Sequence, residues 1–155
     1  MKLLVFSDSH GNSFAMLRAI AQSSPDMIVH LGDGGRDVLK IETQFPQIPL
    51  KAVRGNCDIG SILPDTELFP VGKVKILITH GHIYGVKWTL EALIDEARAR
   101  GADLVMLGHT HIANYSMSGG LYVLNPGTCG LSQAPSYAEV VIDDSGEIAC
   151  KIIRL

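Results

Sequence analysis

An acid and a histidine stand two residues apart where the first apolar run of the chain ends. The run covers residues 3–6, and Asp8 and His10 follow it, ahead of Gly11. Such a run before a glycine predicts a buried strand that delivers polar side chains to a loop at its C-terminal end. If the backbone stays extended through Ser9, the side chains of Asp8 and His10 point to the same side. A carboxylate and an imidazole directed at one point can bind a divalent cation.

Further apolar runs also end in residues that commonly bind metal ions. These residues are Asp33, Asn56, His80 and the pair His109 and His111. With Asp8 and His10 they make seven, which is too many for one catalytic zinc ion but suits two ions about 3.5–4 Å apart. Two such ions need a bridging acid, and Asp33 is the natural candidate because it stands alone on a short loop flanked by glycines. Asn56 would bind through its amide oxygen.

Each of these residues has a structural explanation when it is considered alone. A single Asp at the end of a strand is usually a turn residue or a helix cap, and an Asn after Gly usually marks a turn. A single histidine is more often a hydrogen-bonded, partly buried side chain than a ligand. Separate structural roles do not explain why nearly every polar residue at the end of an apolar run is of a metal-binding type. The whole set therefore predicts a metal site.

The elements that must position these residues alternate between strands and helices. Expected strands at 3–6, 27–31 and 50–53 alternate with expected helices at 14–21 and 37–45, which is typical of a parallel βαβ sheet. Ligands of such sheets bind beyond the carboxyl ends of the strands. The second half of the chain continues with a strand at 74–79, a helix at 88–99, a strand at 104–107, and short strands at 115–117, 121–124, 137–142 and 148–153. We expect an antiparallel arrangement at this end.

Length and composition limit the other possibilities. With 155 residues, 46% of them hydrophobic, residues 1–155 are expected to form a single domain. A net charge of −3 provides no basic surface for nucleic acid, and no apolar stretch reaches the roughly 18 residues of a membrane span. Cys57, Cys129 and Cys150 form no C-x-x-C pair, and the first apolar run is too short for a signal peptide. These features favour a cytoplasmic protein.

The order of the motifs resembles a known family. Asp8-Ser9-His10, Gly32-Asp33, Gly55-Asn56, His80 and Gly108-His109-Thr110-His111 are similar to the five motifs of the calcineurin-like metallophosphoesterases. The small size resembles the compact bacterial and archaeal phosphodiesterase subgroup. The resemblance implies an α/β fold in four layers, with two mixed sheets flanked by helices. It also implies that one ion takes Asp8, His10, His111 and Asp33, and the other takes Asp33, Asn56, His80 and His109.

The activity implied by this resemblance is hydrolysis of a small soluble phosphodiester. The nucleophile would be a hydroxide bridging the two ions, and Asp33, Asn56 and His109 would be the residues central to catalysis. Mn is the expected metal, and Fe, Zn, Ni or Co suit the same ligands. No membrane partner is expected, nucleic acid is disfavoured, and a homo-oligomer is possible.

One position departs from the larger members of the family. They carry a histidine directly after the metal-binding Asn, where it stabilises or protonates the leaving group, and Cys57 occupies that position here. A thiol is a poorer acid–base group than an imidazole near neutral pH. We therefore expect better turnover of phosphodiesters with good leaving groups. His82 is a candidate to replace that histidine at the leaving group. The alternative is that His82 only supports the ligands or is exposed on its loop.

Two other functions are alternatives. The scaffold subunit of retromer resembles this family in fold and binds protein partners, but it has lost metal-site residues, whereas all the ligand positions match here. A nuclease is the second alternative. The net negative charge of the chain and the lack of a basic patch disfavour it. Hydrolysis that depends on divalent ions would exclude the scaffold.

Overall fold

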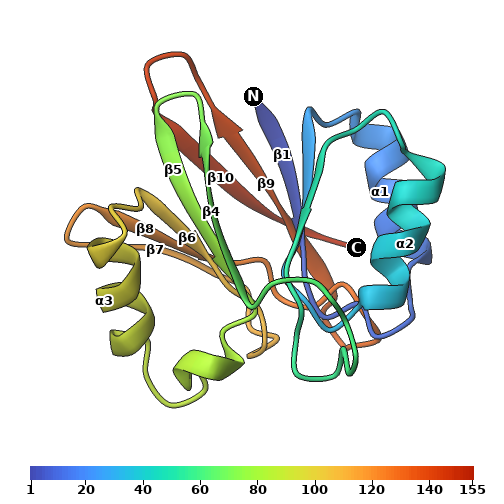
Figure 1. Cartoon of the computed structure of the whole chain (residues 1–155). Helices are drawn as coiled ribbons and strands as arrows, with labels where there is room; N and C mark the ends of the chain where they lie inside the picture. Colours follow the sequence, from blue (N-terminus) through green and yellow to red (C-terminus); the bar gives the residue numbers. More distant parts are fainter.

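Two five-stranded sheets lie face to face, and helices cover the outer surface of each (Figure 1). The computed structural model describes residues 1–155. Helices α1 (Phe14–Ser23) and α2 (Gly35–Gln44) lie on one sheet, and α3 (Glu91–Ala99) lies on the other. The resulting four layers confirm the predicted α/β sandwich of two mixed sheets between helices. No helix combines the length and apolar character that a membrane span requires.

The first sheet contains the predicted parallel βαβ units. Its strands, in spatial order, are β10 (Ile148–Arg154), β9 (Ser136–Ile142), β1 (Lys2–Phe6), β2 (Met27–His30) and β3 (Leu50–Ala52). The strands β1, β2 and β3 are parallel, with α1 and α2 as the connections, and β9 is antiparallel to both β1 and β10. The carboxyl ends of the three parallel strands consequently meet at one edge.

The second sheet differs in two ways from the prediction. Its order is β4 (Thr66–Val71), β5 (Val74–Thr79), β6 (Leu104–Met106), β8 (Leu121–Asn125) and β7 (Asn114–Ser118), and a short 3-10 helix, η1 (His82–Tyr84), follows β5. The strand β4 was not predicted, because Pro70 lies inside it; proline is tolerated there since β4 is an edge strand. The expected antiparallel pairing holds for β7 with β8 and for β9 with β10, whereas β8 lies parallel to β6.

Alternation along the central strands explains the layering. On β1, Leu3 and Val5 belong to the apolar cluster between the two sheets, while Leu4 and Phe6 belong to a second cluster beneath α1 and α2. This is the period of two expected for a strand that is buried on both faces. A third cluster joins the second sheet to α3. Hydrophobic packing therefore fixes the sheets against each other and aligns the loops that follow their parallel strands.

Candidate metal centre

The seven predicted ligands meet at the edge where parallel strands of both sheets end. Asp8 and His10 follow β1, Asp33 follows β2, Asn56 follows β3, His80 follows β5, and His109 and His111 follow β6. Both sheets contribute, so the site depends on their packing against each other. The side chains of these residues form two adjoining groups of donor atoms.

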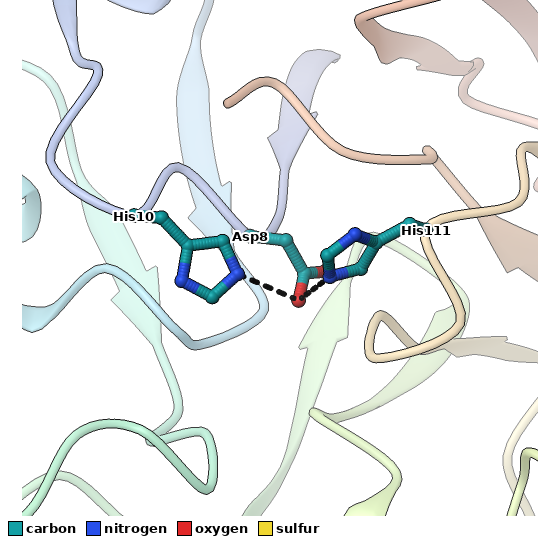
Figure 2. A group of neighbouring side chains, drawn as sticks. All are labelled: Asp8, His10 and His111. Atoms are coloured by element: carbon teal, nitrogen blue, oxygen red, sulfur yellow. Dashed lines mark ion pairs between the residues drawn. The ribbon is translucent and has the colours of Figure 1, made fainter. Parts of the chain in front are cut away.

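The first group consists of Asp8, His10 and His111. The rings of the two histidines lie on either side of the Asp8 carboxylate (Figure 2). The Oδ1 atom of Asp8 is 3.0 Å from Nε2 of His111 and 3.9 Å from Nε2 of His10. Asp8 is fully buried, while the side chains of His10 and His111 are 40% and 45% exposed. The group is thus closed by protein behind Asp8 and open to solvent in front.

The second group surrounds His80, which is fully buried. Its Nε2 atom lies 3.2 Å from Oδ1 of Asn56, 3.1 Å from Nδ1 of His109 and 3.4 Å from Oδ2 of Asp33. The carbonyl of Leu31 lies 2.8 Å from Nδ1 of His80 and accepts a hydrogen bond from that ring nitrogen. This bond leaves the lone pair of a neutral ring on Nε2, where it faces the other donors.

Asp33 lies between the two groups. Its Oδ2 is 3.4 Å from Nε2 of His80 and 3.9 Å from Nε2 of His10. Oδ1 of Asp8 is also 3.9 Å from Nε2 of His80, so both acids border the second group. The main-chain N–H of Cys57 donates to the other oxygen of Asp33, at 2.7 Å. This bond holds the Asp33 carboxylate with Oδ2 toward the histidines.

Left-handed backbone conformation directs most of these side chains to the centre. Among the six non-glycine residues with positive φ, five are predicted ligands: Asp8, His10, Asp33, His109 and His111, with φ between 46° and 66°. The conformation costs an L-residue about 1–2 kcal/mol, and such strain clusters at functional sites. The prediction that the chain stays extended through Ser9 is therefore wrong. The strand β1 ends at Phe6, and local turns converge the side chains instead.

The surroundings of Asp8 test whether these residues suit a cation. Its Oδ2 accepts hydrogen bonds from Oγ of Ser7 (2.5 Å) and from the N–H of His109 (3.1 Å). Its Oδ1 is buried and has no hydrogen-bond partner; His111 approaches it to 3.0 Å without hydrogen-bond geometry. Leaving a buried carboxylate oxygen unpaired is costly. A divalent cation between Asp8 and the facing imidazoles would pair that oxygen, so the residues fit a metal ion.

The charges at the centre favour an ionised Asp33. Burial opposes its ionisation, but the contact with His80 and the N–H of Cys57 outweigh burial and hold the pKa of Asp33 well below its usual range. For His80, burial disfavours the charged ring, yet Asp33 and Asp8 raise its pKa overall. The site therefore carries anionic oxygens that attract positive charge.

Asp58 is an important residue that was not predicted from the sequence. Its carboxylate accepts hydrogen bonds from the main-chain N–H groups of Asp33 (2.8 Å), Gly35 (2.7 Å) and Gly55 (2.8 Å). It thereby fastens the loop after β2 to the loop after β3. The sequence signal was its place in Gly55-Asn56-Cys57-Asp58, which resembles the compact phosphodiesterase subgroup but does not indicate this role.

A second supporting network lies beneath His10. Oγ of Ser9 donates to Oδ2 of Asp37 (2.6 Å) and lies 3.2 Å from Nε2 of His30, while the N–H of Gly11 donates to the same Asp37 oxygen (2.8 Å). Burial lowers the pKa of His30 to about 4, so the ring is neutral near pH 7. This network anchors the loop that carries Asp8 and His10 to the start of α2.

Cys57 and His82 both lie near the predicted ligands. The Sγ atom of Cys57, a ring nitrogen of His10 and a carboxylate oxygen of Asp33 lie within 4.8 Å of one another. The pKa of the exposed Cys57 thiol is raised, mainly by Asp33, which disfavours a nucleophilic thiolate. The His82 ring lies 5.4 Å from that of His80 and 6.2 Å from that of His109, measured between centroids. His82 is the first residue of η1.

The fold and the strand-end donor set define a metallophosphoesterase. A family model described as a calcineurin-like phosphoesterase superfamily domain matches residues 1–145, and the chain belongs to this family.

Named relatives agree with this assignment. The chain is 36% identical to the probable metallophosphoesterase YsnB of Bacillus subtilis over 151 residues, which cover 93% of this chain and 86% of that protein. It is 31% identical to the phosphodiesterase YfcE of Escherichia coli in an alignment that covers 84% of this chain and 80% of YfcE. Among solved structures, Vps29 of Entamoeba histolytica complexed with Zn²⁺ is similar over 99% of both chains, with a TM-score of 0.79 and 25% identity.

Proposed function

We propose that this chain is a phosphodiesterase that uses two divalent cations to hydrolyse a small phosphodiester. One observation carries the proposal: seven side chains from five strand ends converge, and the buried Oδ1 of Asp8 among them has no hydrogen-bond partner. Relatives named as phosphodiesterase and probable metallophosphoesterase support the same reaction class.

The two donor groups suggest how the residues divide between the ions. Asp8, His10 and His111 would hold one cation, and Asn56, His80 and His109 the other, with Asp33 shared between them. Mn²⁺ is the ion we expect, and Fe, Zn, Ni or Co suit the same ligands. When bound, such cations activate water for attack on phosphorus and neutralise the charge that develops on the phosphate oxygens.

The protein groups around the centre keep the donors in place. The carbonyl of Leu31 fixes the His80 ring, the N–H of Cys57 fixes Asp33, and Ser7 together with the N–H of His109 fixes Asp8. We assign Asp33, Asn56 and His109 as the residues nearest the reacting group, because Asp33 lies between the two donor groups and Asn56 and His109 belong to the second group beside it. Fixed donors reduce the reorganisation needed when charge develops.

The position of Cys57 suggests which esters turn over well. No imidazole follows Asn56, and the raised pKa of the Cys57 thiol makes it a weak proton donor at neutral pH. His82 is the remaining candidate to protonate a leaving group: it is half-buried, and its pKa is lowered by burial and by His80. We therefore propose substrates whose leaving group needs little protonation, such as aryl phosphodiesters.

A reconstitution assay tests the proposed function. The protein is stripped of metal, Mn²⁺ is added back, and hydrolysis of bis(p-nitrophenyl) phosphate is followed against a blank of Mn²⁺ alone. We expect activity that rises with Mn²⁺ and disappears on chelation. Full metal binding with no hydrolysis over several divalent ions would instead favour the scaffold alternative. Cleavage of single-stranded nucleic acid that is lost in Asp33→Ala would favour the nuclease.

A further inference from the structure

An open groove of about 810 Å³ leads away from the candidate metal centre between α2 and the loop that follows β3. His10, Asp33 and Cys57 lie at its inner end. The groove is therefore continuous with the position at which a phosphate would contact the donor groups. A phosphodiester bound there carries two substituents on phosphorus, and one of them can extend along this groove.

The walls of the groove expose large aliphatic side chains. Ile59 is 96% exposed and Ile62 is 100% exposed on the loop, and Leu39 of α2 is 61% exposed across from them. Leu63, which is partly exposed, adds further apolar surface to the lining. Single exposed apolar residues are ordinary, but several that line one groove beside a reactive centre are typical of a ligand-binding surface.

The two walls are held in place without a ligand. Asp58 lies within the loop and bonds to the N–H groups of Asp33 and Gly35 on the α2 side. The other end of the loop is fixed by Arg54, whose main-chain N–H donates to the carbonyl of Pro64 (2.9 Å) and whose side chain pairs with Asp65. The exposed isoleucines thus lie on an anchored loop, so binding requires little ordering of the protein.

Most of the charged groups in the groove are already paired within the protein. The carboxylate of Asp58 is occupied by its three N–H donors, and that of Asp37 by Ser9, Gly11 and Lys40. Two charged side chains of α2 are exposed on the lining, Arg36 at the start of the helix and Glu42 further along it. Arg36 and Glu42 carry opposite charges, so the groove itself has no strong net charge, and its exposed aliphatic side chains are the surface that an apolar substituent would contact.

We infer that this groove binds an apolar ester substituent of the substrate, so the preferred phosphodiesters carry one aryl or alkyl group large enough to contact Ile59 and Ile62. This inference rests on the proposed function, because it takes the phosphate to lie at the metal centre. The groove would select substrates by the free energy of burying the substituent, while the donor groups act on the phosphate common to all of them.

Binding of inert probes tests the inference separately from catalysis. The probes are methylphosphonate monoesters that share one anionic group and differ only in the ester: methyl, phenyl or n-hexyl. Affinity for Zn²⁺-loaded protein is measured by NMR of ¹³C-labelled isoleucine methyl groups, since Zn²⁺ is diamagnetic. Ile59→Ser/Ile62→Ser is the test variant, and Met117→Ser, which replaces a 58% exposed side chain of β7 outside the groove, is the matched control.

We expect the phenyl or the hexyl ester to bind wild type about tenfold more tightly than the methyl ester, with shifts at the methyl groups of Ile59 and Ile62. The double variant should lose that advantage and keep its affinity for the methyl ester, and Met117→Ser should behave as wild type. Tighter binding of the phenyl ester alone indicates that the groove prefers a planar ring, and tighter binding of the hexyl ester indicates that it accepts an alkyl chain. Either result supports the inference. Equal affinities of wild type for all three esters, or an advantage that survives in the double variant, would overturn it.

Hydrolysis of bis(p-nitrophenyl) phosphate by the same samples separates the two proposals. Hydrolysis without any preference among the probes overturns the groove and leaves the proposed function standing. Binding with the expected preference but no hydrolysis supports the groove as a ligand site and counts against the phosphodiesterase.

Discussion

Gly55 lies so close to Asp33 that a β-carbon at position 55 would be 2.0 Å from Oδ1 of Asp33 and 2.5 Å from its main-chain nitrogen. The same Oδ1 accepts the hydrogen bond from the N–H of Cys57. The glycine before Asn56 therefore allows the loop after β3 to approach the acid that lies between the two donor groups. Any other residue at this position must displace Asp33.

Gly55→Ala should consequently impair metal binding more than folding. We expect a loss of activity of about 100-fold or more and reduced metal occupancy, because Asp33 can no longer lie between the histidines. Gly101→Ala is the control: Gly101 has φ of +68° and open space where the methyl group of alanine would lie, so this change adds backbone strain alone. Metal content by elemental analysis, together with unfolding curves, checks this. Wild-type metal affinity in Gly55→Ala would contradict the role given to the close approach.

Asp33 is predicted to contribute more to activity than a ligand that belongs to only one of the two donor groups. Asp33→Asn should lower activity further than His111→Ala, because Asp33 lies within 4 Å of both His10 and His80 whereas His111 contacts only the first group. Steady-state kinetics at saturating Mn²⁺ measures the difference. Activity of Asp33→Asn close to wild type would exclude the bridging assignment.

Asp58 should act by holding the two loops together and not by touching substrate. Asp58→Ala leaves three main-chain N–H groups without their acceptor and should lower the free energy of unfolding by about 2–4 kcal/mol. Asp58→Asn keeps one acceptor oxygen and should fall between Ala and wild type. Chemical denaturation of the metal-free variants gives the values. Equal stability of Asp58→Ala and wild type would show that water replaces the carboxylate at no cost.

Burial of His30 predicts a specific sensitivity to acid. Its pKa falls from 6.5 to about 4 on folding, chiefly through burial, so below pH 6.5 the unfolded chain binds a proton that the folded protein does not. The stability associated with the neutral ring is complete above pH 6.5 and declines as the pH falls toward 4.

His30→Gln removes this titration. Between pH 7 and pH 4.5, metal-free wild type should lose about 1–3 kcal/mol more stability than His30→Gln, as measured by urea unfolding. Other titrating groups, including His80, are common to both proteins and cancel in the comparison. Parallel pH profiles of the two proteins would rule out His30 as the cause.

The sequence patterns were sufficient to predict the strand-end residues and the parallel βαβ units, whereas the four layers were implied by the family resemblance. Apolar runs ending in Asp8, Asp33 and His80 are local patterns, and the alternation of strands with helices predicts parallel strands whose ends meet. The edge strand β4 escaped prediction because Pro70 interrupts its pattern. Its position is set by pairing with β5, a tertiary contact that outweighs the local signal.

The detailed geometry of the site could not be predicted from the sequence. The left-handed conformations of Asp8 and His10 depend on contacts with distant loops, such as the hydrogen bond from the N–H of His10 to the carbonyl of Asp33 (3.0 Å). Asp58 acts on Asp33 across 25 residues of sequence. The groove likewise depends on how α2 and the loop after β3 are spaced, which only the packed structure defines.

Anomalous diffraction from crystals of the protein grown with Mn²⁺ would locate the bound cations. We predict two anomalous peaks about 3.5–4 Å apart, one beside Asp8, His10 and His111 and the other beside Asn56, His80 and His109, with Asp33 contacting both. A single peak at saturating Mn²⁺, or peaks that lie away from Asp33, would contradict the two-ion centre.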